Sequence, residues 1–476
     1  MNQNKKPLYE KLAAHEEKSV YSFHVPGHKY GSLIPKDASR YFQELLKLDA
    51  TELSGLDDLH SPEGIILEAE ELLAQLHHVK RSYFLVNGST VGNLAMIMAA
   101  VKENEKILVQ RNCHKSVLNG IRLAGAIPIL LGPELDEEWG IASGVSVQTV
   151  SQAIELYPDA KAIILTYPNY YGMVYDLQGI AYLCHEKGIP VLVDEAHGAH
   201  FIAGDCFPKS SVELGADLVV QSAHKTLPAM TMGAYLHYNT NFIRKEAVES
   251  YLQMLQSSSP SYPIMASLDI ARGYLATFTR EDGEYLLKKI TEFKDRLQQI
   301  KGIKVLSYKN GEGDPLKITL QSASALSGFE IQKLLEDEGI YTEMADPNNV
   351  LLVFPLLKKG MDFPFNEVNA AFEKALHALA PLKKTKLNFA LAHQGISKLE
   401  INIKNQGNLE SRLVPLDTAS GKVCAEFIIP YPPGIPLLFP GEVISRESIE
   451  QIKLLLETGA RFQGGKNLLQ RKMSIY

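Results

Sequence analysis

The feature that most constrains the fold is an alternation of short apolar runs and helical stretches between about residues 65 and 240. The runs are continuously apolar, which is typical of strands that are covered on both faces. Helical patterns such as VSVQTVSQAIELY and LQGIAYLCHEKG lie between several of them. The alternation predicts an α/β domain with a mostly parallel, doubly wound sheet, in which ligands bind beyond the carboxyl ends of the strands. The runs are RSYFLV (81–86), KILVQ (106–110), IPILL (127–131), AIILT (162–166), PVLVD (190–194), DLVVQ (217–221) and GAYLH (233–237).

The chain has 476 residues, which is too long for one ordinary core. From about residue 301, short strand patterns and the helical stretch SGFEIQKLLEDEG indicate a smaller α+β domain. The last part is richer in proline and contains EFIIPYPPGIPLLFPGE. We therefore expect an N-terminal segment (1–60), a large ligand-binding domain (61–300), a small α+β domain (301–384) and a C-terminal module (385–476).

Charge and composition exclude several classes of partner. A net charge of −7 gives no electrostatic reason to bind nucleic acid or an anionic membrane. No apolar run approaches the roughly 18 residues of a membrane span, and the N-terminus MNQNKKPLYEKL does not resemble a signal peptide. The four cysteines are scattered without a C-x-x-C pair, so we expect neither disulfides nor a metal site. These features favour a cytoplasmic protein.

Two motifs place an acid and a lysine at consecutive strand ends. In VDEAHGAHF, Asp194 and Glu195 close an apolar strand, and in QSAHKTL, Lys225 follows the next strand by one turn. Taken singly, each motif has an ordinary interpretation: the acids could be a solvated strand end, and the lysine could be a surface residue. Together they match pyridoxal 5′-phosphate, because a lysine holds its aldehyde as an imine. A carboxylate keeps the pyridine nitrogen protonated, so that the ring accepts electrons from the substrate.

The cofactor's phosphate also needs a site. The stretch VNGSTVGNLAMIMAAV runs from a strand through a turn into an apolar helix, where backbone N–H groups and the hydroxyls of Ser89 and Thr90 can hold a phosphate. Serine and threonine are also ordinary helix caps, so this signal is weak alone. Ser222 and His224 could add contacts from the lysine loop. His114 follows the strand KILVQ, where a surface histidine is the ordinary interpretation and stacking on the pyridine ring the alternative.

In combination, these motifs resemble the Orn/Lys/Arg decarboxylase family of fold-type-I pyridoxal-phosphate enzymes. The matching stretches span residues 23 to 442, nearly the whole chain. The combination is specific, although VDEAHG and S-x-H-K also occur loosely in other fold-type-I enzymes. The stretches are FHVPGHKYG, LDDLHSPEG, VNGST, RNCHKS, VDEAHGAHF, QSAHKTL, SSSPSYPIMASLD and YPPGIPLLFPGE.

The resemblance implies a role for each matching residue. Ser258 would reach the phosphate of the partner subunit, which implies a homodimer with shared active sites, and Glu442 in FPGE would lie on the substrate side. The other roles implied are the phosphate loop (Ser89, Thr90), the histidine that stacks on the cofactor (His114), the partner of the pyridine nitrogen (Asp194), residues lining the ring (Ala196, His197), phosphate or pocket ligands (Ser222, His224) and the Schiff-base lysine (Lys225).

Two departures from the family pattern limit the transfer of detail. Large enterobacterial members carry an N-terminal wing before the pyridoxal domain, whereas FHVPGHK begins at residue 23 here. We therefore expect a compact member of the Gram-positive type, without that wing and without the decamer that depends on it. His197 stands where those members carry a tryptophan, so their pocket cannot be transferred directly.

The resemblance implies decarboxylation of a basic amino acid, with arginine first, then lysine or ornithine, feeding polyamine synthesis. An acid such as Glu442 or Asp346 could receive the cationic end of any of the three. The main alternative is an aminotransferase, which usually holds the substrate carboxylate with an arginine from the small domain. No arginine lies between Arg296 and Arg412, which favours decarboxylation. A non-catalytic relative would be expected to lack Lys225 or Asp194, and both are present.

Overall fold

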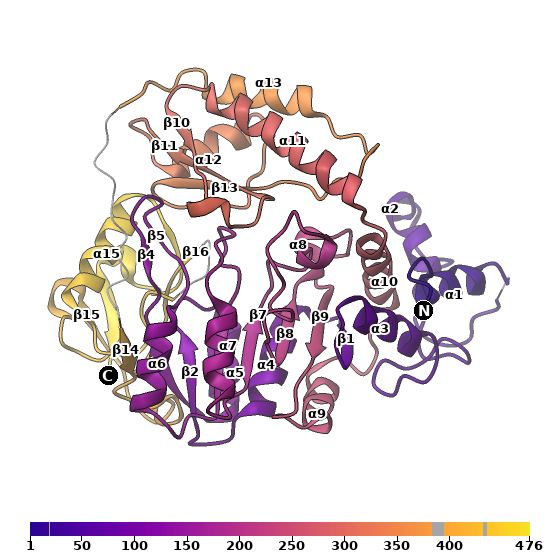
Figure 1. Cartoon of the computed structure of the whole chain (residues 1–476), viewed down its shortest axis with the longest axis horizontal. Coiled ribbons are helices and arrows are strands. Elements are labelled where there is room, and N and C mark those ends of the chain that lie inside the picture. Colours follow the sequence, from indigo (N-terminus) through magenta and orange to yellow (C-terminus); the bar gives the residue numbers. More distant parts are fainter. Residues whose placement is uncertain (19, 383–394, 432–435) are drawn as a thin grey trace. The chain divides into compact units, whose positions relative to one another are not determined.

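The chain is described by a computed structural model that covers residues 1–18, 20–382, 395–431 and 436–476 (Figure 1). It forms two compact units, each assembled from separate stretches of sequence. Within the described residues we find no helix with the length and apolar character that a membrane crossing requires. The first unit comprises Met1–Ala100, Pro190–Gly204 and Lys209–Thr279, and the second comprises Val101–Ile189, Asp205–Pro208 and Arg280–Tyr476.

In the first unit, four strands lie side by side in the order β1-β9-β8-β7. β7 and β8 run parallel, whereas β9 is antiparallel to both β8 and β1. β1, β7 and β8 therefore all point the same way, and their carboxyl ends meet at one edge. Every residue of β7, β8 and β9 is buried, as the continuous apolar runs predict. The strands are β1 (Arg81–Leu85), β7 (Val191–Asp194), β8 (Leu218–Gln221) and β9 (Ala234–Tyr238).

One helix of the first unit, α4, packs against β7, β8 and β9. A Cβ atom at Gly92 would lie 2.7 Å from Val220 Cγ2 and 2.8 Å from Leu85 Cδ1. The absence of a side chain at Gly92 therefore lets the helix approach the sheet closely. The helices are α1 (Pro7–Glu16), α2 (Lys36–Lys47), α3 (Ile65–Leu76), α4 (Gly88–Ala100), α8 (Ala223–Thr226), α9 (Lys245–Leu255) and α10 (Tyr262–Ala276).

The second unit contains four further strands in the order β6-β2-β3-β14. β2 is parallel to β6 and to β3, whereas β14 is antiparallel to β3. The helices α5 to α7 connect or follow these strands, which is the expected α/β pattern. The elements are β2 (Lys106–Gln110), α5 (Lys115–Ala124), β3 (Ile127–Leu131), the hairpin β4 (Leu135–Asp136) and β5 (Ile141–Ala142), α6 (Val147–Leu156), β6 (Ala162–Thr166), α7 (Leu177–His185) and β14 (Ile396–Lys398).

The same unit holds an antiparallel sheet of order β10-β11-β13-β12 and a C-terminal part with its own apolar core. The first group comprises α11 (Arg280–Gln298), β10 (Ile303–Val305), β11 (Lys317–Ser322), α12 (Gly328–Asp337), β12 (Met344–Ala345), β13 (Asn349–Val353) and α13 (Phe365–Leu376). The C-terminal part comprises α14 (Ile403–Gln406), β15 (Arg412–Pro415), β16 (Ile428–Tyr431), α15 (Arg446–Glu457), β17 (Arg461–Gly464) and β18 (Lys472–Ile475).

The predicted α/β class and the smaller α+β region are confirmed. All seven apolar runs form strands, and GAYLH, which becomes β9, is antiparallel to both of its neighbours, β1 and β8. The predicted domain boundaries stay predictions, and the one between residues 384 and 385 lies outside the described residues. Residues 432–435 of the YPPGIPLLFPGE motif also lie outside them.

Candidate active site

The acid and the lysine predicted from sequence lie on neighbouring parallel strands of the first unit. Asp194 is the last residue of β7, and its side chain is buried. β8 ends one residue before Ser222, and the short helix α8 then carries Lys225. Lys225 Nζ lies 2.9 Å from Nε2 of His197, which is itself buried. Both chemical groups therefore belong to the same edge of one compact unit.

The Asp194 carboxylate is held by two donors. The Asn93 side-chain amide donates to Oδ2 at 2.8 Å, and the backbone N–H of Ala196 donates to Oδ1 at 3.2 Å. Asn93 belongs to α4, one turn beyond its N-terminus. Sequence reasoning missed Asn93, although a lone amide in the apolar stretch VGNLAMIMAAV could have marked it. These two hydrogen bonds fix the orientation of the Asp194 carboxylate.

The expected phosphate loop lies at the same edge. Gly88 has a φ of +78°, a left-handed conformation that favours glycine, and it begins α4 directly after β1. The Ser222 hydroxyl donates to the Ser89 hydroxyl at 2.8 Å, so the two serines predicted from separate motifs meet. Thr90 is exposed. A helix N-terminus with two adjoining hydroxyls is suited to binding a phosphate.

A buried polar network supports the strand ends from within the protein. Glu195, next to Asp194, accepts hydrogen bonds from Gln221 Nε2 at 2.6 Å, Ser210 Oγ at 2.8 Å and Ser211 N at 2.6 Å. Burial raises the pKa of Glu195 to about 7, against the opposing effect of these donors. Gln221 in turn accepts from Nε2 of His237 at 3.0 Å. The network therefore links the end of β7 to β8 and β9, next in sequence to Asp194.

Two further predicted residues of the first unit have definite surroundings. His224 Nδ1 lies 3.0 Å from the carbonyl oxygen of Gly233, so Nδ1 carries the proton in that hydrogen bond. Ser258 is exposed. Its neighbour Ser257 donates its N–H to Asn87 Oδ1 at 3.4 Å, which places the serine run beside the turn that precedes Gly88.

His114 belongs to the second unit and is the N-cap of α5. Its Nδ1 accepts from Ser116 N at 3.2 Å and lies 2.8 Å from Ser116 Oγ. Because a backbone N–H can only donate, Nδ1 must be unprotonated, so the proton of the neutral ring is on Nε2. The capping contact therefore fixes both the tautomer and the ring orientation.

Glu442, predicted to lie on the substrate side, forms a buried ion pair in the second unit. Arg111 Nη1 and Nη2 contact its two carboxylate oxygens at 2.5 and 2.8 Å, and Phe439 N donates to Oε2 at 3.2 Å. Arg111 also donates to the carbonyl oxygen of Leu437 at 3.1 Å and lies over the Phe439 ring. Both charged side chains are at least 95% buried. The pair connects the loop before His114 to the C-terminal part.

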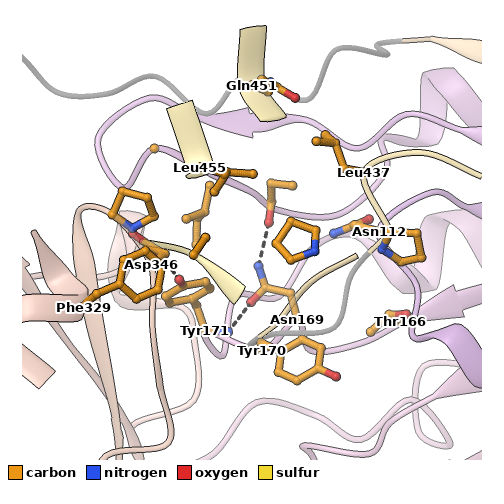
Figure 2. A pocket seen from close by; sticks show the side chains of 17 residues that line it. Asn112, Thr166, Asn169, Tyr170, Tyr171, Phe329, Asp346, Leu437, Gln451 and Leu455 are labelled. Carbon is orange, nitrogen blue, oxygen red and sulfur yellow. Dashed lines mark hydrogen bonds between the residues drawn. The ribbon is translucent and has the colours of Figure 1, made fainter. Parts of the chain in front are cut away.

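The second unit also contains a largely apolar cavity of about 150 Å³. It begins where β2 and β6 end, at Asn112 and Thr166, and extends to the loop after β12 and to α15. Figure 2 shows Asp346 beside Phe329 and Tyr171, with Leu437 and Asn112 on the other side of the view. Asp346 was one of the two acids that the sequence offered for a cationic substrate.

Comparison with known proteins gives two matching family profiles. Residues 6–313 match "Orn/Lys/Arg decarboxylase, major domain", and residues 401–470 match "Orn/Lys/Arg decarboxylase, C-terminal domain". The chain is 44% identical to "Uncharacterized protein YaaO" of Bacillus subtilis (strain 168), over 99% of this chain and 98% of that protein. It is 35% identical to the arginine decarboxylase of the same organism, over 98% of this chain and 96% of that enzyme.

The solved structures add a likeness of fold. The constitutive lysine decarboxylase of E. coli superposes with a TM-score of 0.79 at 20% sequence identity, over 99% of this chain and 82% of that one. This likeness supports the α/β architecture predicted from the apolar runs. The major-domain profile covers more than half of the chain and the arginine decarboxylase matches almost all of it, so the chain belongs to the Orn/Lys/Arg decarboxylase family.

Proposed function

We propose that the protein decarboxylates a basic amino acid with pyridoxal 5′-phosphate as cofactor, and that arginine is preferred over lysine and ornithine. The observation that carries the proposal is the convergence of Asp194, Lys225 and the Ser89–Ser222 hydroxyl pair at one strand edge of the first unit. Family membership supports the reaction type, and the 35% identity to an arginine decarboxylase supports arginine.

The residues present fit the cofactor. Ser89, Ser222 and the N-terminus of α4 would hold its phosphate, Asp194 its pyridine nitrogen and Lys225 its aldehyde carbon. The Asn93 amide donates to the buried Asp194 carboxylate and so holds it in one orientation. When bound, the cofactor supplies an acceptor for the electrons that remain on the substrate after carbon dioxide leaves.

The chain's own residues orient groups and hold protons. Asn93 and Ala196 direct the Asp194 carboxylate, while the Glu195 network fixes the strands that carry it. A lysine nitrogen must lose a proton before it attacks a carbonyl carbon, and His197 Nε2 is placed to accept a proton from Lys225. We propose that His114, with its proton fixed on Nε2, stacks on the cofactor ring.

The test is to incubate the purified, cofactor-loaded protein with carboxyl-labelled arginine, lysine or ornithine and to measure released carbon dioxide. We expect release from arginine to exceed release from the other two. Lys225→Ala should abolish release, whereas the exposed control Lys187→Ala should not. A keto-acid product without carbon dioxide would instead indicate an aminotransferase.

We further propose a homodimer in which Ser258 contacts the phosphate of the partner subunit. The exposure of Ser258 beside the turn before the phosphate loop supports a role at that site. After the inactive Lys225→Ala and Ser258→Trp subunits are mixed and exchanged, each heterodimer should have about half the activity of a wild-type dimer, since one of its two sites would be intact. Failure to recover despite confirmed exchange would contradict the shared site.

The cellular setting is also part of the proposal. We propose a cytoplasmic location, in keeping with the scattered cysteines of the sequence. The amine product would feed polyamine synthesis. Isotope tracing from labelled arginine in cells with and without the gene would test this assignment.

A further inference from the structure

The two acids that could meet a cationic side chain have different partners. Glu442 is matched by the Arg111 guanidinium through two short contacts. Asp346 instead accepts from the Tyr171 hydroxyl, from the side-chain amide of Asn349 at 2.9 Å, and from the backbone N–H groups of Asn348 and Asn349 at 2.7 and 2.8 Å. All these donors are neutral, and no lysine, arginine or histidine among the described residues forms an ion pair with Asp346. Its charge therefore lacks a counter-ion there.

The carboxyl of Asp346 lines the cavity shown in Figure 2. Burial raises its pKa above the ordinary value for an aspartic acid. Buried charges in proteins are normally paired, because removing a charge from water without a partner is unfavourable. A cation bound in the cavity would provide that partner.

Two other polar atoms of the lining lack partners. Thr166 Oγ1 and Gln451 Oε1 are buried, and neither has a hydrogen-bond partner among the residues described. Thr166 is only 7% exposed. Buried polar atoms are nearly always hydrogen-bonded, so these two oxygens indicate that a ligand or water completes the site.

Most of the remaining lining is apolar and includes Phe329, Leu437 and Leu455, although Asn112 and Asn169 also line the cavity. A cavity of about 150 Å³ is large enough for a group of roughly the size of benzene. An aliphatic chain of a few carbons fits those walls, and its polar end can meet the acid and the two oxygens. A purely apolar ligand would leave the Asp346 charge without a counter-ion and the two oxygens without hydrogen-bond partners.

We propose that this cavity binds a short aliphatic chain ending in an ammonium or guanidinium group, with Asp346 as the counter-charge. The inference rests on the proposed function in one respect, since the chain is then the side chain of the basic substrate or a free amine of the same chemistry. Asp346, rather than Glu442, would be the acid that selects for a cationic ligand.

The test uses butylguanidine and butylamine as cationic probes and butylurea as a neutral isostere, with binding to the holoenzyme measured by titration calorimetry. We expect both cations to bind and butylurea to bind at least about tenfold more weakly, as loss of a charge-assisted contact implies. Asp346→Asn should weaken the cations by a similar factor without affecting butylurea. The matched control is Glu343→Gln, which removes an exposed charge from the same segment.

A second variant tests the cavity without changing the segment that carries Asp346. Ala460→Phe, at another residue of the lining, should fill the cavity and abolish binding of all three probes while the thermal unfolding temperature is retained. Competition between butylguanidine and the amino-acid substrate would identify a substrate side-chain site, and non-competitive inhibition a separate amine site. Equal binding of butylguanidine and butylurea, or unchanged binding in Asp346→Asn, would overturn the proposal. Because calorimetry needs no turnover, cation binding without decarboxylation would refute only the proposed reaction.

Discussion

Replacing Glu195 with glutamine should alter the pH dependence of stability. In the folded protein, burial raises the pKa of Glu195 from 4.5 to about 7. Between these values the folded state holds a proton that the unfolded state releases, so the free energy of unfolding falls as the pH rises. Each pH unit corresponds to about 1.4 kcal/mol, which gives a change of about 3 kcal/mol from this residue across the whole range.

The hydrogen bonds predict how the glutamine variant differs. The protonated acid can donate to Ser210 Oγ and still accept from Gln221 and Ser211. A glutamine amide must instead point its NH₂ group toward the donor of Gln221 or of Ser211. Gln221 cannot turn over without losing its contact with His237. One unsatisfied donor costs about 1–3 kcal/mol, so the variant should be less stable at pH 5, with a deficit that shrinks toward pH 8.

The assay is urea unfolding of both proteins, followed by circular dichroism at intervals between pH 5 and 8. Glu186→Gln, an exposed acid in the other unit, is the control and should leave the pH dependence unchanged. A deficit of the Glu195 variant that stays constant over the range, or grows with pH, would refute the argument. Such a result would mean that Glu195 does not hold its proton near neutral pH.

Three further predictions concern the proposed site and its support. Lys225→Ala should abolish carbon dioxide release and the visible absorption band of the loaded wild-type enzyme, and a variant that keeps both would contradict the assignment. Asp194→Asn should retain the cofactor, measured after dialysis, but lower turnover about a hundredfold, or about 3 kcal/mol in the barrier, because a neutral amide no longer favours a protonated pyridine. Glu442→Gln should reduce the free energy of unfolding by about 3–5 kcal/mol in urea titrations, since Arg111 is left buried without its counter-charge. Joint replacement of Arg111 by Met and Glu442 by Leu should recover part of that loss, and a single-variant loss below about 1 kcal/mol would argue against a stabilising pair.

Much of the fold could be predicted because the apolar runs are strong local signals. Strands buried on both faces need continuous apolar sequence, and all seven runs formed strands. The meeting of Asp194 and Lys225 at one edge followed from two consecutive strands, β7 and β8, that pair in parallel. The connection between them contains a 3-10 helix at Phe201–Ala203 rather than the α-helix of a complete αβ unit. The meeting of Ser89 and Ser222 followed in the same way, because both motifs come directly after strands that point in one direction.

Contacts without a local signal could not be predicted. Asn93 is one amide in an apolar helix, and its orientation toward Asp194 depends on how closely α4 packs on the sheet. The donors Ser210 and Ser211 reach Glu195 from a loop that begins fifteen residues away, and Gln221 reaches it from β8. Glu442 is conspicuous in its motif, but no pattern in the sequence shows that Arg111 occupies its carboxylate.

The Arg111–Glu442 pair joins residues 331 positions apart, and this separation has a consequence during synthesis. At roughly 5–20 residues per second, the ribosome needs tens of seconds to reach the acid after it has added the arginine. Throughout that interval the guanidinium must stay hydrated, so the segment that carries His114 cannot reach its final burial. A nascent chain that stops before the C-terminal part would therefore have the apolar strands of its sheet but an unfinished His114 loop. Proteolysis of ribosome-bound chains of increasing length should show protection at this loop only after residue 442 has left the exit tunnel.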